Sequence, residues 1–139
     1  MIDKNEFERC VVYHYNFLVE TYGFSFECSY NTERLFIIEY SKGIIVKIIY
    51  SYANRFIDIE LYNLPPTHQA YNRRKNSIKL LDIIQRYNSS YTFDMYNAIM
   101  PHAISINDSI EQTAHLLSSY GDELLSEKLW FSCEDVLGE

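Results

Sequence analysis

The sequence predicts one α+β domain over residues 1–139, with an N-terminal helix, a four-stranded antiparallel meander and C-terminal helices packed on one face of the sheet. Two observations predict this order. Apolar residues recur at helical spacing before residue 23 and again after residue 77, whereas between residues 24 and 62 they alternate with polar ones. A chain of 139 residues also buries enough surface to fold without a disulfide or a metal.

The first helix is predicted from a stripe of residues spaced four and three apart. These residues are Phe7, Val11, His14, Leu18 and Tyr22. Asp3 and Glu6 have the spacing of a capping box, so we expect the helix to begin after Asp3. Gly23 supplies a residue that can end it.

Four runs with a period of two follow, at residues 24–30, 34–40, 44–50 and 56–62. Three pairings set the predicted register: Tyr30 opposite Arg34, Tyr40 opposite Ile44, and Tyr52 opposite Arg55. In this register all four strands place their apolar residues on one face, and a slip of one residue would break the agreement. The pattern therefore predicts an antiparallel sheet with one face buried.

The rest of the chain predicts a polar loop and then helices. Residues 65–76 form the loop. Ser77 is expected to cap a short helix, residues 91–100 to form another, and Asn107 to cap a longer one that Gly121 ends. A last helical piece is expected over residues 122–129.

The other face of the predicted sheet is apolar on its two central strands. If helices cover only one face, an exposed patch results from Leu35, Ile37, Ile45, Ile49 and Tyr62. Exposed apolar patches of this kind usually mark an interface. The alternative is that the C-terminal residues Leu129, Trp130 and Phe131 fold over the patch.

Negative charge is concentrated at the C-terminal end. The whole chain has a net charge of −7, and residues 108–139 alone carry eight acids against Lys128. An acidic surface suits a basic protein partner and argues against a nucleic acid, so we take Asp122, Glu123 and Glu127 as candidate contact residues. The alternative is that these acids form solvated helix faces.

Two pairs of residues could carry chemistry. Cys10 and His14 are four residues apart on the predicted first helix, as a nucleophile and its base would be. Glu111 and His115 repeat the spacing on a later helix and could begin a metal site, although zinc needs a third ligand. A buried Cys with a core His, and an exposed Glu–His pair, are the alternatives that we favour. No motif for binding a nucleotide phosphate is present, and we expect no cofactor and no metal.

Location follows from what the sequence lacks. It contains no apolar run of membrane-spanning length and no secretory signal at its N-terminus. We therefore expect a cytoplasmic protein that does not bind a membrane. The three cysteines, Cys10, Cys28 and Cys133, are far apart in sequence and indicate no disulfide framework.

The run Ala114-His115-Leu116-Leu117-Ser118-Ser119-Tyr120-Gly121-Asp122-Glu123-Leu124-Leu125 resembles the closing segment of small bacterial immunity-type proteins, which are encoded beside polymorphic toxins. The order of helix, meander and closing helices is similar as well. Ser126-Glu127 stands where that family would have a Gly-Asp turn. The resemblance implies an intracellular inhibitor that binds a toxin domain, and it brings no catalytic residues.

Three functions are thus expected from the sequence. The first is a non-enzymatic protein-binding domain, such as an immunity-type inhibitor that binds a basic toxin domain. The second is a homo-oligomeric scaffold or structural protein that self-associates through the patch on the sheet. The third is an enzyme that uses Cys10 and His14.

Overall fold

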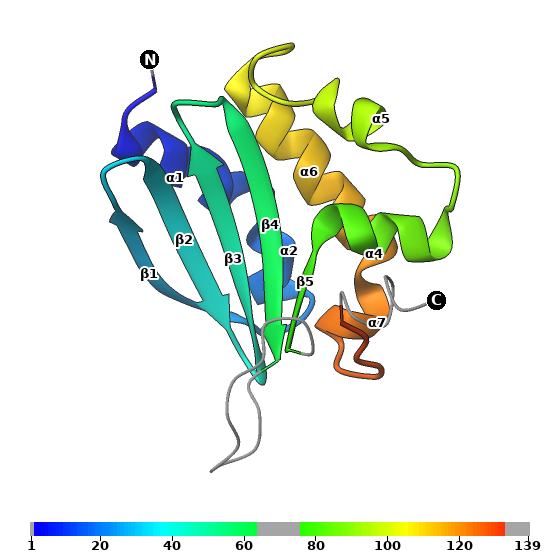
Figure 1. The fold of residues 1–139 in the computed structure, drawn as a ribbon. Helices are drawn as coiled ribbons and strands as arrows, with labels where there is room; N and C mark the ends of the chain where they lie inside the picture. The colour runs from blue at the N-terminus through cyan, green and yellow to red at the C-terminus, as the bar shows by residue number, and fades with distance from the viewer. Residues whose placement is uncertain (1, 64–75, 133–139) are drawn as a thin grey trace.

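A five-stranded antiparallel sheet in the order β1-β2-β3-β4-β5 forms the centre of the computed structural model, which describes residues 2–63 and 76–132 (Figure 1). The strands are β1 (Ser25–Asn31), β2 (Leu35–Ser41), β3 (Ile44–Ser51), β4 (Phe56–Asn63) and β5 (Ser77–Lys79). The helices are α1 (Lys4–His14), α2 (Asn16–Glu20), α4 (Leu80–Tyr87), α5 (Phe93–Asn97), α6 (Ile106–Tyr120) and α7 (Asp122–Leu125). This confirms the predicted α+β class.

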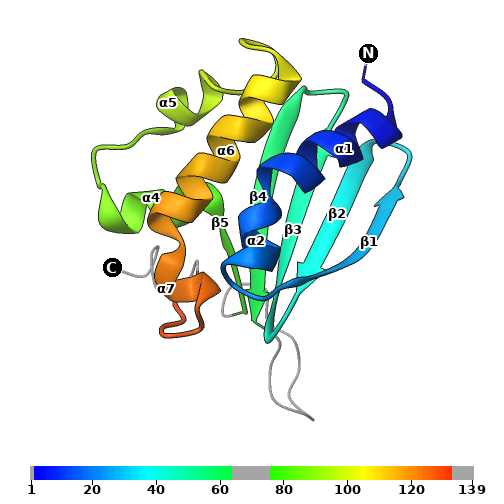
Figure 2. The same ribbon diagram turned by 180° about the vertical axis from the view of Figure 1, so that it is seen from behind.

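The helices lie on one face of the sheet and beyond one of its edges. Seen from behind, α1, α2 and α6 cross in front of the strands, whereas α4 and α5 lie beyond β5 (Figure 2). No described helix lies on the opposite face, which we call the back face (Figure 1). The predicted packing on one side is therefore confirmed for the described residues.

The core is a row of aliphatic side chains at the centre of the sheet. Ile38, Ile48 and Ile59 stand side by side on β2, β3 and β4 and are completely buried. The helices bury their own apolar stripes against this row, with Val11, Leu18, Ile110, Ala114 and Leu117 among them. Each such side chain contributes about 2 kcal/mol to the free energy of unfolding.

The register of the sheet agrees with the predicted register only between β3 and β4. Tyr50 lies opposite Ile57 as predicted. Between β2 and β3, Tyr40 lies opposite Val46 rather than Ile44. That shift of two residues leaves every side chain on its predicted face, because the side-chain period of a strand is two.

The predicted pairing of β1 with β2 is wrong. A β-bulge lies between Phe26 and Cys28, so that Phe26 is opposite Tyr40 but Cys28 is opposite Glu39. The extra residue reverses the faces of the rest of the strand. Cys28 therefore lies on the back face, whereas the predicted register placed it on the core face.

The predicted first helix is interrupted at Tyr15. Asp3 caps α1 as expected, since its carboxylate accepts the Glu6 N–H at 2.8 Å, and Gly23 has the positive φ of +77° that suits a stop after α2. At the interruption the Tyr15 ring is fully buried, and its hydroxyl donates to Thr113 Oγ1 of α6 at 2.8 Å. This hydrogen bond offsets the loss of hydration of the hydroxyl.

Several helix ends differ from the sequence-based expectation. Ser77 does not cap a helix, because Ser77–Lys79 pairs with β4 and buries Ile78 opposite Leu61; α4 begins afterwards. Ser105, not Asn107, caps α6 by accepting the Asp108 N–H at 3.1 Å. The last helix ends at Leu125, short of residue 129, while Gly121 ends α6 as predicted. Of the predicted loop, only Asn76 lies within the described residues.

A buried hydrogen bond anchors α5 to the sheet and can be tested. The Tyr96 hydroxyl donates to the Ile57 carbonyl of β4 at 2.7 Å, and Tyr96 is 1% exposed. We expect Tyr96→Phe to lower the free energy of unfolding by about 1–2 kcal/mol, because the buried carbonyl loses a partner. Chemical denaturation measures the change. Tyr13→Phe is the control, since Tyr13 is 77% exposed, and equal midpoints for both variants would contradict the prediction.

Candidate functional site

The apolar residues predicted to share the back face do so. Ile37 lies opposite Ile49, and Ile45 lies opposite Tyr62, all pointing away from the helices. Leu35 lies on the same face of β2. These side chains are half-buried rather than widely exposed, and Ile37 is only 8% exposed.

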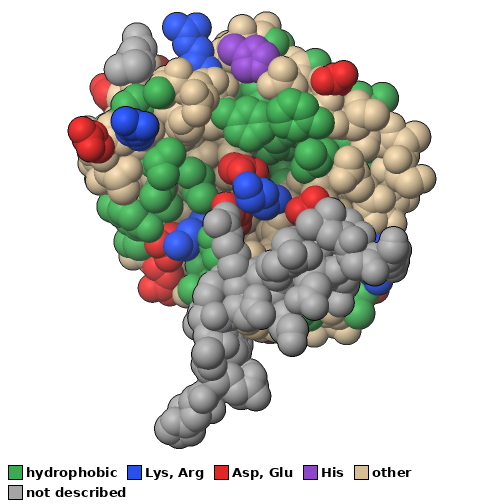
Figure 3. Space-filling model, in the orientation of Figure 1, with side chains coloured by type: hydrophobic (Ala, Val, Ile, Leu, Met, Phe, Trp, Pro, Cys, Tyr) green, Lys and Arg blue, Asp and Glu red, His purple; other side chains and the backbone are tan. Residues whose placement is uncertain are grey.

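A ladder of alternating charges crosses the back face between these apolar residues. Glu39 lies opposite Lys47, Lys47 opposite Glu60, and Glu60 opposite Lys79, so that neighbouring strands always present opposite charges. Lys47 Nζ is 4.0 Å from Glu39 Oε2, and Lys79 Nζ is 3.3 Å from Asp58 Oδ2. Figure 3 views this face and shows acidic and basic side chains next to one another between hydrophobic areas.

Tyrosines complete the polar contacts of the ladder. The Tyr30 hydroxyl donates to Glu39 Oε2 at 2.9 Å, and the Tyr62 hydroxyl donates to Glu60. The Lys47 ammonium lies 4.9 Å from the centre of the Tyr62 ring, a cation–π distance. The sequence-based register had placed Lys47 opposite Ile37, and for that reason the ladder was not predicted.

The described C-terminal residues do not cover the back face. Phe131 packs under the Arg86 guanidinium at 4.2 Å and against the Tyr87 ring, both on α4. Leu129 and Trp130 line a small hollow with Ile44 of β3. The alternative in which these residues fold over the patch is therefore wrong for the described part of the segment, and residues 133–139 lie outside it.

The three acids predicted to contact a partner are exposed, but each also has a partner within the chain. Asp122 accepts a hydrogen bond from the Tyr22 hydroxyl at 2.6 Å, and Glu123 accepts one from the Tyr87 hydroxyl at 2.9 Å. Burial, together with Asp122, raises the pKa of Tyr22 to about 12. Neither tyrosine hydroxyl brings a positive charge to the carboxylate that it contacts.

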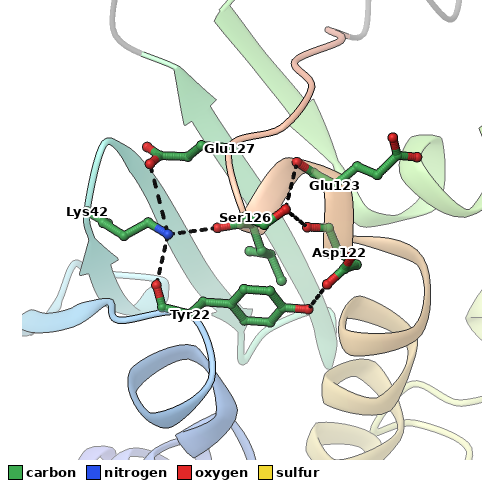
Figure 4. Close-up of polar contacts among 7 residues, drawn as sticks. Tyr22, Lys42, Asp122, Glu123, Ser126 and Glu127 are labelled. Carbon is green, nitrogen blue, oxygen red and sulfur yellow. Dashed lines mark hydrogen bonds and ion pairs between the residues drawn. The ribbon is translucent and has the colours of Figure 1, made fainter.

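Glu127 belongs to a cluster around Lys42 that holds α7 in place (Figure 4). Lys42 Nζ, at the turn between β2 and β3, donates to the Tyr22 carbonyl at 2.8 Å and to the Leu125 carbonyl at 3.0 Å. The Glu127 carboxylate lies 3.9 Å from the same nitrogen. One ammonium thus joins the N-terminal helices, the sheet and the last helix.

Cys10 and His14, four residues apart on α1, are not hydrogen-bonded to each other in the part of the chain that the structure describes. His14 Nε2 instead lies 3.0 Å from Asn107 Oδ1 of α6. Burial and the nearby Glu6 raise the pKa of the Cys10 thiol, which opposes formation of a nucleophilic thiolate. No three His, Cys, Asp or Glu side chains come together as a metal site in the part of the chain that the structure describes.

A cleft of about 850 Å³, which sequence analysis did not predict, lies between α5 and α6. Tyr91, Met95 and Ile99 line one side, and α6 lines the other. The α6 wall carries Leu116 with the polar side chains of Glu111, Gln112 and His115. The Glu111–His115 pair is exposed, as the sequence analysis favoured, and both residues line this cleft.

Helix α5 exposes two large apolar side chains beside this cleft. Phe93 is 52% exposed and Met95 is 51% exposed, with the exposed Asp94 between them. They point outward because Thr92 caps the helix and Tyr96 is buried on its inner side. We call Phe93, Asp94 and Met95 the α5 ridge. An exposed aromatic next to an exposed methionine is typical of a protein-binding surface.

The stretch of sequence that contains α5 and α6 has no basic side chains other than histidine. No Lys or Arg occurs in residues 87–127, which contain six acids. Among the described residues Asp94, Asp108 and Glu111 have no ion-pair partner. The absence of Lys and Arg could have been read from the sequence, but the cleft could not.

A second, smaller hollow of about 170 Å³ lies on the other side of the ridge, where the Phe93 ring stacks on Phe56 at 6.2 Å. Asp58 and Asp82 line it together with Lys79. Burial raises the pKa of the Asp58 carboxyl, and the adjacent Lys79 ammonium offsets part of that rise. Burial raises the pKa of Asp82 as well.

None of the protein-family models, curated proteins or solved structures compared with the chain matches it. None of the described helices has the length and apolar character needed to cross a bilayer.

The Lys42 cluster yields a prediction about α7. Lys42→Met removes two hydrogen bonds and one ion pair, and we expect the free energy of unfolding to fall by about 1–2 kcal/mol. The amides of residues 122–125 should exchange with deuterium faster than in the unaltered protein. Lys128→Met is the control, because Lys128 is exposed. Unchanged exchange in α7 would show that Lys42 does not hold the helix.

Asp58 yields a prediction about pH. Its raised pKa means that folding favours the protonated carboxyl, so its ionisation lowers the free energy of unfolding as pH rises from the ordinary value of 3.8 through the raised pKa. Asp58→Asn removes this titration. The free energy of unfolding of the variant minus that of the unaltered protein should be larger at pH 7 than at pH 3. Urea denaturation at both values measures it, and an equal difference at both would refute the assignment.

Proposed function

We propose that this chain is a non-enzymatic protein-binding domain, and that the α5 ridge is its contact surface. One observation carries the proposal: Phe93 and Met95 are both more than half exposed on a single five-residue helix. Burying two such side chains against a partner supplies several kcal/mol of binding free energy. The buried Tyr96 anchors α5 from its inner side, and the Phe93 ring adds a stacking contact with Phe56 while it stays 52% exposed.

The charge of the surrounding surface favours a basic partner. Residues 87–127 hold six acids and no Lys or Arg. A negative surface speeds the encounter with a positive one, whereas buried apolar contacts slow the dissociation of the complex. Charge would thus select the partner, and the Phe93 and Met95 side chains would retain it.

An immunity-type inhibitor that binds a basic toxin domain in the cytoplasm is the specific form that we propose. The order of an N-terminal helix, an antiparallel sheet and closing helices supports it. So does the position of the resembling segment, residues 114–125, which forms the end of α6 and all of α7. An enzyme that uses Cys10 and His14 gains no support, because burial raises the pKa of that thiol.

A homo-oligomeric scaffold is the second candidate, and one feature of the back face favours it. Its charges run Glu39, Lys47, Glu60, Lys79 across four strands. Two copies stacked face to face about a two-fold axis would place each acid against a base. Against this candidate, Glu39 and Lys47 are already paired within the chain, so a dimer gains little from them.

The proposed contact surface can be tested by capture from a lysate of the source cells. We expect the unaltered chain to retain a basic protein, and Phe93→Ser with Met95→Ser to lose most of it, because the apolar contacts that slow dissociation are gone. Val12→Ser with Tyr13→Ser is the matched control, since these α1 residues are also exposed.

Quantitative mass spectrometry of the retained proteins provides the measurement. Recovery of the same proteins at the same level by all three chains would refute the α5 ridge as the contact surface. Recovery of the chain itself as the only partner would favour the scaffold.

A further inference from the structure

We infer that the cleft between α5 and α6 binds a segment of the partner protein in which a Lys or Arg stands next to a large apolar residue. The inference rests on the proposed protein-binding function and adds the chemistry of the bound segment. Its basis is the pairing, in one cleft, of an apolar wall with a carboxylate that has no partner among the described residues.

The apolar part of the cleft comes from both helices. Tyr91, Met95 and Ile99 on the α5 side face Leu116 on α6. Of these four, Met95 is the one that is more than half exposed, and a methionine adapts its shape to different apolar side chains. This wall suits a leucine-like or aromatic side chain of the bound segment.

The polar part of the cleft lies on α6 alone. Glu111, Gln112 and His115 are all exposed there, and none has a side-chain hydrogen bond or ion pair within the described residues. Glu111 is the one carboxylate that lines the cleft. A guanidinium or an ammonium is the complementary group, and a guanidinium can bind both carboxylate oxygens at once.

The openness of the cleft favours a peptide segment over a small molecule. Its volume of about 850 Å³ has room for several side chains, yet Met95, Glu111, Gln112 and His115 leave its walls exposed. Small-molecule sites bury most of their ligand, whereas a segment of a folded partner needs contact on one side only. No Lys or Arg is among the residues that line the cleft, so neither repels an incoming cation from its walls.

The test uses two acetylated tripeptide amides, Leu-Arg-Leu and Leu-citrulline-Leu, titrated into ¹⁵N-labelled protein. Citrulline has the shape of arginine without its charge. We expect the arginine peptide to shift amide signals of α5 and α6, and to bind about fivefold more tightly than the citrulline peptide. Glu111→Gln should remove that difference. Glu20→Gln, which neutralises an exposed acid on α2, should keep it.

Three results would overturn the inference. They are amide shifts confined to elements other than α5 and α6, equal affinity of the unaltered protein for both peptides, or no amide shift up to the solubility limit of the peptide. A further variant, Gln112→Trp, fills the cleft without changing its charge. If the cellular partner still binds this variant as tightly as the unaltered chain, the cleft is not its site although the protein-binding function stands. If the peptide binds in the cleft but the lysate yields no partner, the cleft stands and the proposed function fails.

Discussion

Burial of Ile38, Ile48 and Ile59 in one row on a single face of the sheet is the constraint on which the other features depend. On each of these strands the residues directly before and after the buried isoleucine must point to the back face, where no described helix lies. Charged side chains can occupy that face only if they are hydrated or paired. The direct opposition of Glu39, Lys47, Glu60 and Lys79 satisfies this requirement along the strands. A slip of one residue would place this ladder in the core and the aliphatic row in solvent.

The same sheet determines why the α5 ridge is exposed. Helix α5 is held from its inner side at β4, where the Ile57 carbonyl accepts the Tyr96 hydroxyl. The Ile57 N–H donates to Met100 Sδ, three residues after the end of α5, with 3.3 Å between nitrogen and sulfur. A helix of five residues has one inner side, and Tyr96 fills it. Phe93 and Met95 must then point outward. Their exposure is thus a consequence of the anchor, and it leaves Met95 in the wall of the cleft beside α6.

Sequence reasoning succeeded where a repeating pattern is undisturbed and failed where one residue is inserted or where distant segments meet. The uninterrupted alternation of β3 and β4 was enough to pair Tyr50 with Ile57. The alternation of Phe26 and Cys28 looks equally regular, yet a bulge separates them, and a period of two does not reveal an extra residue. The cleft depends on the path of the chain that places Met95 and Glu111, sixteen positions apart, in the same cleft lining, and no local pattern encodes that path.

The acids of α7 and those near the cleft have different physical roles although the sequence presents them alike. Asp122 and Glu123 accept hydrogen bonds from neutral tyrosine hydroxyls, so they add to the negative potential while they hold the fold together. Glu127 is the exception, because the Lys42 ammonium offsets its charge. At physiological ionic strength such a potential extends about 8 Å from the surface, which is enough to orient a basic partner only near contact. Steering of the proposed partner can therefore come from the whole region, whereas specificity has to come from side chains that would touch that partner. Glu111 is the one carboxylate that lines the cleft, and it has no ion-pair partner among the described residues.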